Sequence, residues 1–354
     1  MKAKVSNLLI AAALMLIAAD LYAQPKLVDA DSKIEYAIEW HLNGGTQNPS
    51  NTDTYTAEDG LVLATPVREG YTFDGWFENA DLSGSKITEI KKGETQKKVF
   101  YAGWVITKEQ AIKIMKKEMV TVIPAGKKVN LENFAGTEGI QVINAYQIGK
   151  HEVTQELYMA VMGNNPSNFK NNPAPDEIQE KRPVENISWQ EACDFCNKLS
   201  ELMGLTPCYD KDYECNYSAN GFRLPSRGEW EMAARGGVAG GWDYEYSGGD
   251  YPDNVAWNWN NSYWENEYRE KGTHEVGKKN PNSLGIYDMS GNVWEWCNRY
   301  SYVDGWGYKY TNHYYCGGSY YDYGSEISVT SSGYSTYGEG WEKCGFRLAC
   351  SLFN

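Results

Sequence analysis

Positive charge, early cysteines and long apolar runs are scarce in this sequence, and each scarcity argues against a class of protein. Lysine and arginine total 33 against 47 aspartates and glutamates, so the net charge is −14. A nucleic-acid partner is therefore not expected, because it needs a basic face. The four histidines, at 41, 151, 274 and 313, form no close pair, which argues against a clustered-histidine metal site. After residues 8–19 no apolar run is long enough to cross a membrane.

Aromatic residues and glycine are abundant instead. The chain holds 27 tyrosines, 13 tryptophans and 35 glycines. This composition favours a loop-rich fold with many aromatic rings over a helical bundle. With 354 residues the chain has room for two domains.

The N-terminus reads as a signal peptide over residues 1–23. Lys2 and Lys4 precede an apolar run, and Ala23 offers a small residue before a cut at Gln24. An uncleaved membrane anchor is the alternative. No cysteine lies near the cut, so lipidation there is not expected. We therefore expect an exported protein at the bacterial cell surface, in the periplasm or secreted, with no membrane span after cleavage.

All eight cysteines lie beyond residue 190, at positions 193, 196, 208, 215, 297, 316, 344 and 350. An even count in an exported chain favours disulfides. Zinc is the alternative, because 193 and 196 have CxxC spacing, but no second pair matches it.

After a polar linker at 24–35, residues 36–105 predict a small all-β module. Strand patterns occur at 38–42, 61–63, 70–77 and 98–104, with a turn at Asn43-Gly44-Gly45. This turn, the stretch 68–76 (REGYTFDGW) and the stretch 101–104 (YAGW) resemble the Listeria–Bacteroides repeat of internalin-type surface proteins. The resemblance implies a β-grasp-like spacer or adhesive module without catalysis, with its aromatic residues in the core.

A helical linker is predicted at 106–118, with Thr107 as its N-cap. The second domain, 119–354, begins with a strand that Pro124 and Gly126 end, followed by a strand at 142–149. Helices follow at 155–162 and 189–203, and a third starts near 225–231. The stripe Ala192, Cys196 and Leu199 is the predicted buried side of the second helix. Beyond the third helix only short strands are expected.

The last forty residues hold the candidate binding surface. Between Cys316-Gly-Gly-Ser-Tyr and Cys344-Gly-Phe-Arg, residues 321–341 contain no His, Cys, Lys or Arg. Tyrosine and tryptophan give contact area at low entropic cost, and serine and glycine adapt, as in antibody loops. Aromatic residues at 300–315 extend the patch, and part of them would fill the core. The candidate ligand-binding residues are Tyr320, Tyr321, Asp322, Tyr323, Ser325, Tyr334, Tyr337 and Trp341.

From residue 119 on, the sequence is similar to the formylglycine-generating-enzyme (sulfatase-modifying factor) family. The matching segments are 148–154 (IGKHEVT), 165–167 (NPS), 182–189 (RPVENISW), 221–226 (GFRLPS), 229–231 (EWE), 285–296 (GIYDMSGNVWEW), 317–319 (GGS) and 345–347 (GFR). The resemblance implies an α+β protein with a C-type-lectin-like fold of the formylglycine-generating type and much irregular structure.

Enzymes of this family bind copper through two cysteines after the Gly-Gly-Ser segment. Here Asp322 and Ile327 hold those places, and neither replaces a soft thiolate ligand. No copper is therefore expected, and the chain leans away from being an enzyme. An oxidoreductase with a non-standard site, built from another cysteine pair, is the alternative. The clustered His/His/Glu iron site of the related sulfoxide synthases has no counterpart among the four histidines.

The resemblance also implies structural calcium. The ligands would be the side chains of Asp288 and Glu295 and the carbonyls of Gly291 and Val293, all hard oxygens. The alternative is that Asp288 caps a turn and Glu295 is exposed. A second family site would use Asn254 and Val255. Its carboxylate position holds Tyr268, for which Glu265 or Glu267 would have to substitute.

In the family a cysteine of the second helix pairs with one just after Gly-Phe-Arg. Cys196 matches the first position, Leu348 holds the second, and Cys350 follows two residues on, so the resemblance favours Cys196–Cys350. Cys208–Cys215 would close a short hairpin. The pairing of the remaining four cysteines is open, with 297–316 one option.

The C-terminal segment further resembles the variable proteins of diversity-generating retroelements, which include treponemal surface proteins. Adenine-directed mutagenesis in that family produces the residue types that dominate 321–337. We therefore expect an exported, non-catalytic display or adhesion protein whose C-terminal surface binds a protein or glycan. The alternatives are the non-standard oxidoreductase and a plain structural envelope protein.

Overall fold

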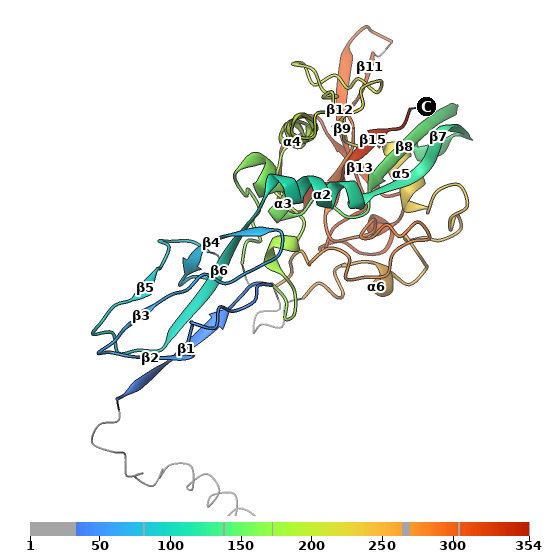
Figure 1. The fold of residues 1–354 in the computed structure, drawn as a ribbon. Coiled ribbons are helices and arrows are strands. Elements are labelled where there is room, and N and C mark those ends of the chain that lie inside the picture. The colour runs from blue at the N-terminus through green and yellow to red at the C-terminus, as the bar shows by residue number, and fades with distance from the viewer. Residues whose placement is uncertain are drawn as a thin grey trace, which may run out of the picture.

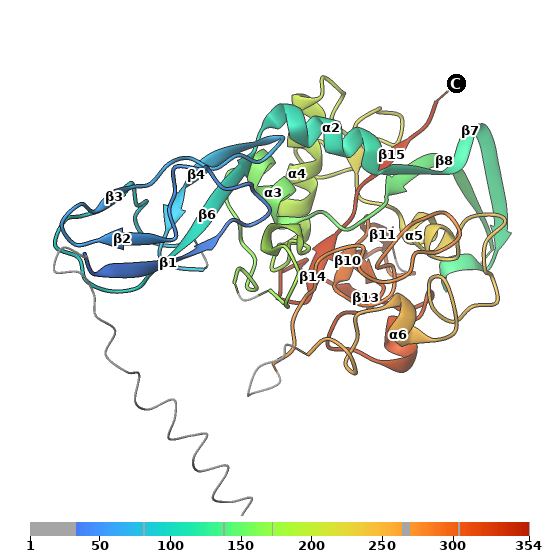
Figure 2. The ribbon, with the colours of Figure 1, turned by 60° about the horizontal axis from the view of Figure 1, so that its bottom comes forward.

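The computed structural model describes residues 33–80, 82–136, 139–171, 173–263, 270–303 and 305–353. The predicted signal peptide lies outside these residues. An elongated β module forms one end of the molecule, and a larger α+β domain forms the other, with helix α2 between them (Figures 1 and 2).

The β module is a mixed sheet. Its strands are β1 (Glu35–His41), β2 (Thr54–Thr56), β3 (Leu61–Val62), β4 (Tyr71–Phe77), β5 (Glu89–Ile90) and β6 (Lys98–Ile106). Four of them pair in the order β2-β1-β6-β4, with β1 and β6 parallel, and β3 pairs with β5. Trp76 and Phe100 are fully buried, and the indole of Trp76 donates to the Ala64 carbonyl at 3.1 Å. The aromatic residues of this module thus form its core, as predicted.

Helix α2 (Lys108–Glu118) connects the module to the larger domain. Thr107 caps it by accepting a hydrogen bond from the Gln110 N–H, as the sequence predicts. Ala111 and Met115 are buried in the same core cluster as Leu157 of the next helix. The helix is therefore packed into the larger domain on one side.

Among its described residues, the larger domain contains two small sheets and three main helices. One sheet has the order β7-β8-β15-β9, and the other the order β11-β12-β10-β14 with β13 on β12. The elements are β7 (Met119–Glu132), η1 (Phe134–Gly136), β8 (Ile140–Gly149), α3 (Gln155–Met162), η2 (Gln179–Lys181), α4 (Trp189–Leu202), β9 (Phe222–Arg223), α5 (Arg227–Ala234), α6 (Pro252–Val255), β10 (Trp294–Trp296), β11 (Tyr300–Val303), β12 (Lys309–Cys316), η3 (Gly324–Ile327), β13 (Ser332–Ser335), β14 (Cys344–Phe346) and β15 (Ala349–Ser351).

Strand β7 corrects one prediction. The sequence expects it to end at Pro124–Gly126, but pairing with β8 resumes at Lys128 and runs to Glu132. The register shifts between Ile123 and Lys128, so the extra residues are accommodated as an irregularity in the ladder. Proline and glycine therefore interrupt this strand without ending it.

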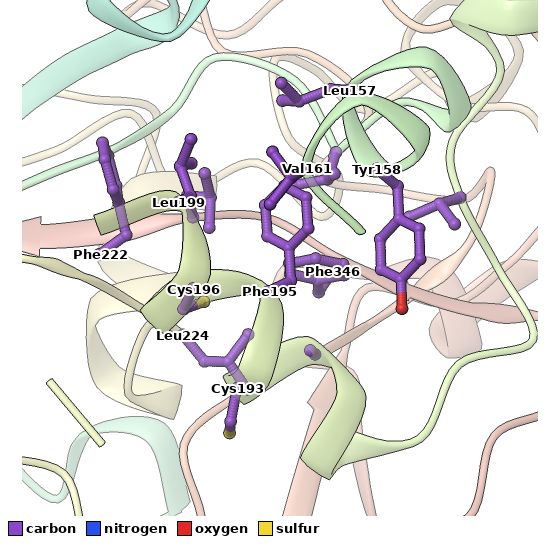
Figure 3. Close-up of a cluster of buried hydrophobic side chains, with 14 of the residues drawn as sticks. Leu157, Tyr158, Val161, Cys193, Phe195, Cys196, Leu199, Phe222, Leu224 and Phe346 are labelled. Atoms are coloured by element: carbon purple, nitrogen blue, oxygen red, sulfur yellow. The ribbon is translucent and has the colours of Figure 1, made fainter. Parts of the chain in front are cut away.

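The helices begin and end where the sequence indicates. Capping boxes start α4 (Ser188 with Glu191) and α5 (Ser226 with Glu229), and α3 ends at Gly163, whose φ is 86°. The apolar sides of α3 and α4 build one core (Figure 3), in which Tyr158 of α3 stacks on Phe195 of α4 at 5.4 Å. Trp230 and Met232 of α5 lie in a second core cluster. The predicted buried stripe of α4, Ala192, Cys196 and Leu199, is fully buried.

Candidate functional site

The C-terminal segment turns sharply after β12 at two glycines. Gly317 and Gly318 have φ values of 98° and 76°, which side chains rarely adopt. A Cβ on Gly318 would lie 2.5 Å from the Ile327 side chain. Asp322 then accepts hydrogen bonds from the N–H and hydroxyl of Ser319. This turn fixes the backbone from which the tyrosines project.

The structure divides the predicted ligand-binding residues into exposed and buried ones. Tyr321, Tyr323, Tyr334 and Tyr337 are 44%, 61%, 58% and 78% exposed, and Ser325 is also exposed. Tyr320 is only 3% exposed, and its ring packs edge-on against Phe169 at 5.3 Å. Trp341 is half-buried between Trp296 and Tyr315. Tyr320 and Trp341 therefore pack in the interior beneath the exposed tyrosines and are not part of the exposed surface patch.

Some of the exposed tyrosines share one face of a sheet. In the antiparallel ladders Tyr314 lies opposite Tyr334, and Asn312 lies opposite Tyr300. Opposite residues and alternate residues point to the same side, so Tyr300, Tyr310 and Tyr334 face one way. They are 56%, 45% and 58% exposed, and we call them the tyrosine face. Cys316 lies on the same side of β12 and is buried in a core cluster, so this end of the tyrosine face is fixed to the domain.

The other exposed tyrosines stand on loops. Tyr321 lies edge-on to the Trp259 ring at 4.6 Å, and the Lys343 ammonium lies 3.8 Å from the Tyr321 ring centroid. Tyr323 begins the turn that leads into η3, and Tyr337 precedes Gly338, which packs against Trp189 and His313. We call Tyr321, Tyr323 and Tyr337 the loop tyrosines. The sequence predicts a single patch of tyrosines. In the structure the exposed tyrosines form two groups instead, one on a sheet and one on loops.

The places of the copper ligands are used structurally. Ile327 is fully buried in a small cluster with Tyr246, Val255 and Ala256. Asp322 caps its own turn. Burial raises the pKa of the Cys297 and Cys344 thiols well above the ordinary value, which disfavours the thiolate that metal binding and redox chemistry require. These thiols give no support to a relocated oxidase site.

The predicted calcium ligands lie in the core. Asp288 is 2% exposed, its Oδ2 accepts from the Gly277 N–H at 2.7 Å, and its Oδ1 is buried without a hydrogen-bond partner among the described residues. Both oxygens of Glu295 accept from the Arg347 guanidinium at 2.6 Å, and Oε2 also accepts from the Trp230 indole. Asp288 therefore offers a ligand oxygen, whereas Glu295 already has partners.

Glu152 adds a third buried carboxylate, which the sequence prediction missed. It accepts hydrogen bonds from the Asn292 side chain and the Val293 N–H. Burial and the charges of Asp288 and Glu295 raise the pKa of Glu152 well above its ordinary value. Glu152 lies in the segment 148–154 that resembles the formylglycine-generating family, and this resemblance was the signal that could have pointed to it. Glu295 pairs with the Arg347 guanidinium, and Glu152 and Asp288 interact with its charge without contacting it. A bound cation would offset the negative charge that this one guanidinium leaves.

The fit to calcium is therefore partial. No three His, Cys, Asp or Glu side chains converge as metal ligands in the part of the chain that the structure describes. Calcium would depend on Asp288 and on main-chain carbonyls such as those of Gly291 and Val293. For the second predicted site, Asn254 is exposed at α6 and Val255 is buried, while residues 265, 267 and 268 lie outside the described residues.

All eight cysteines are free in the structure, so the predicted bonds Cys196–Cys350 and Cys208–Cys215 are not formed there. Burial raises the pKa of Cys196, and the neighbouring thiols that add to this effect are Cys208 and Cys215. The Sγ atoms of Cys297 and Cys316 lie 3.7 Å apart. The disulfides stay predictions.

Two family models match the chain. The sulfatase-modifying factor enzyme 1-like domain matches residues 107–352, and the Listeria-Bacteroides repeat domain matches residues 36–103. Among solved structures, Treponema denticola variable protein 1 is 34% identical with a TM-score of 0.56, over 66% of this chain and 95% of that one. The CarF structure is 30% identical with a TM-score of 0.50, over 66% and 98%.

Two curated relatives match shorter stretches. The chaperone protein LppX of Paenibacillus barcinonensis is 40% identical over an alignment of 183 residues, and the match covers 44% of this chain and 62% of that protein. The inactive C-alpha-formylglycine-generating enzyme 2 of Bos taurus is 33% identical over 125 residues, 34% of each chain. The chain thus spans less than two thirds of either relative.

The described residues include no helix with the length and apolar character that a membrane span requires. The segment order, the two small sheets and the solved relatives agree with the fold that the sequence resemblance implied. The chain belongs to the sulfatase-modifying factor enzyme 1-like family, with the C-type-lectin-like fold of its formylglycine-generating members, and carries a Listeria–Bacteroides repeat before that domain.

Proposed function

We propose that this protein is an exported display or adhesion protein that binds a protein or glycan and does not catalyse. One observation carries the proposal. The segment that would hold the copper cysteines instead presents exposed tyrosines, while Ile327 fills the core and Asp322 caps a turn. Exposed tyrosine offers large contact area with little loss of side-chain entropy on binding.

The buried residues beneath the exposed tyrosines are compatible with variation of the exposed side chains between alleles. Tyr320, Ile327 and Val329 are buried and hold the segment in place, whereas Tyr321 and Tyr323 project outward. Substitution at the exposed positions would leave the core packing unchanged. Similarity to Treponema denticola variable protein 1 supports diversification of this segment by a retroelement. Sibling alleles would then differ at the exposed positions and keep the buried ones.

Export is part of the proposal. Residues 36–103 match the Listeria-Bacteroides repeat, which the sequence resemblance associates with internalin-type surface proteins, and residues 1–23 read as a signal peptide. The module would act as a spacer that holds the binding domain away from the cell. The destination is the cell surface, the periplasm or the medium.

Structural calcium is a second part of the proposal. The unpartnered Oδ1 of Asp288 and the excess of buried carboxylates over Arg347 support it. The ion would bring no reaction chemistry, because it would serve only to hold the loop 288–293 against the start of strand β10.

A binding screen tests the main proposal. Residues 24–354 are applied to a glycan array and to an array of bacterial and host surface proteins. Changing Tyr321, Tyr323 and Tyr337 together to alanine is expected to abolish every specific signal. Tyr251→Ala, at a tyrosine 75% exposed outside both groups, is the matched control and should keep them.

Two outcomes would contradict the proposal. The first is a ligand whose binding survives the triple change and also survives Tyr300, Tyr310 and Tyr334 to alanine. The second is copper-dependent oxidation of a cysteine-containing sulfatase peptide by the purified protein, which would restore the oxidoreductase alternative.

A further inference from the structure

A cavity of about 570 Å³ lies where the β module meets the larger domain, away from both tyrosine groups. Its wall includes Arg68 and Tyr71 from the module, Met115 from α2, and Glu156 and Lys181 from the larger domain. Small-molecule sites have volumes of roughly 300–1,000 Å³ and occur preferentially at domain boundaries. The cavity therefore has the size and the position of a ligand site.

Arg68 is an incompletely partnered cation in this wall. It is 9% exposed, and its Nη1 is buried without a hydrogen-bond partner among the described residues. Its guanidinium stacks on the Tyr71 ring at 3.6 Å, and Nη2 lies 3.9 Å from Glu156 Oε2, beyond hydrogen-bond length. A buried donor without a partner is costly, so an added carboxylate on this guanidinium would be stabilising.

Glu156 is the matching anion. Its Oε2 accepts from the Tyr71 hydroxyl at 2.6 Å, which ties the larger domain to the module. Burial raises the pKa of Glu156, so its charge is only partly compensated by Arg68 and Lys181. An ammonium group beside this carboxylate would stabilise its ionised form.

The charge balance of the wall decides what kind of ligand fits. Five glutamates line the cavity against three basic residues, Arg68, Lys181 and His151. His151 already pairs with Glu118 at 2.6 Å, so four glutamates face Arg68 and Lys181. A simple anion would meet this excess of negative charge, and a simple cation would leave Arg68 without its partner. A zwitterion satisfies both sides, and Ile114, Met115 and Leu157 provide an apolar wall for a side chain.

We propose that this cavity binds a free α-amino acid with an aliphatic side chain. The carboxylate would pair with Arg68, the ammonium with Glu156, and the side chain would lie against Met115 and Leu157. Because these residues belong to both parts of the molecule, the ligand would also hold the module against the larger domain.

Calorimetric titration of the full chain with L-leucine tests this proposal. Two analogues each lack one charge, namely 4-methylpentanoate without the amine and 3-methylbutylamine without the carboxylate. L-Leucine is expected to bind at least about 10-fold more tightly than either, because each analogue loses one charge-assisted contact. It should also raise the thermal midpoint of unfolding in a concentration-dependent way.

Two variants locate the site. Glu156→Gln keeps an acceptor for Tyr71 but removes the charge, and Arg68→Gln removes the cation. Each is expected to weaken L-leucine binding by about 10-fold or more, whereas Glu109→Gln, at the exposed start of α2 outside the cavity wall, should not change it. If Arg68→Gln lowers the thermal midpoint of unfolding, a loss of binding in that variant could come from its lower stability. The location of the site then depends on Glu156→Gln alone.

The proposal is overturned by any of three results. L-Leucine binds no better than its analogues, its binding is unchanged in Glu156→Gln, or no heat is detected at millimolar L-leucine. The last result would mean that the cavity holds only solvent. None of these outcomes bears on the tyrosine surfaces, which are assayed separately.

Discussion

Two neighbouring parts of the C-terminal segment, the loop tyrosines at 321–337 and the Gly-Phe-Arg stretch at 345–347, face opposite surroundings. Tyr323 and Tyr337 are 61% and 78% exposed, whereas Arg347 is fully buried against Glu295. The first part makes contacts at the surface, and the second joins β14 to the core. The difference shows how one segment can combine exposed side chains with residues that hold the core together.

The largest loss of stability is expected on the buried side of this comparison, at Arg347. Arg347→Met leaves Glu295 charged, buried and without its bidentate partner. Breaking a buried pair in this way costs about 3–5 kcal/mol of unfolding free energy. Urea denaturation of both proteins measures the loss. An unchanged midpoint would mean that Glu295 has another partner, such as a cation.

Ile327 tests whether the position that the family resemblance assigns to a copper ligand is part of the core in this protein. Ile327→Ala opens a cavity among Tyr246, Val255 and Ala256 and should cost about 2–4 kcal/mol. The measurement is again urea denaturation, with Tyr323→Ala as the exposed control from the same segment. A loss as small as that of the control would show that the position is not part of the core.

Stability should depend on pH through Glu185. Burial raises the pKa of its carboxyl to about 7 from an ordinary value of 4.5. The folded protein therefore binds this proton more tightly than the unfolded chain, so the unfolding free energy falls as pH rises from about 4.5 to 7, by roughly 3 kcal/mol. Comparing the wild type with Glu185→Gln at pH 5 and pH 8 isolates this effect, since the variant should lack it.

Calcium removal tests the carboxylate cluster. If the site is saturated about 100-fold above its dissociation constant, chelation with EGTA should lower the unfolding free energy by about 2.7 kcal/mol. Asp288→Ala should abolish the response to calcium, whereas Asp243→Ala, an exposed position outside both predicted sites, should keep it. A wild type that does not respond to calcium would remove the ion from the proposal.

The exposed side of the comparison should show the smallest effect on stability. Tyr323→Ala and Tyr337→Ala should each change the unfolding free energy by no more than about 0.5 kcal/mol, because surface side chains without buried contacts contribute little. Urea denaturation measures it. A loss above 1 kcal/mol at either position would mean that the tyrosine packs into the fold.

Local signals predicted the elements well. Thr107 caps its helix as predicted, the helices predicted at 155–162 and 189–203 begin after Thr154 and Ser188, and Gly163 ends the first of these two, because capping depends on residues adjacent in sequence. The end of β7 was misjudged, since its partner β8 continues the pairing beyond the irregularity. Pairing with a distant strand outweighed the local proline and glycine.

The sequence by itself determined the family, the capped helices, the aromatic core of the module and the absence of thiols at the two copper positions. Only the tertiary structure decided which tyrosines are exposed, that Glu295 pairs with a guanidinium 52 residues away, and that Arg68 and Glu156 share a cavity wall. The physical reason is distance along the chain. Composition and caps are read within a few residues, whereas strand register and buried charge pairs join segments far apart in sequence.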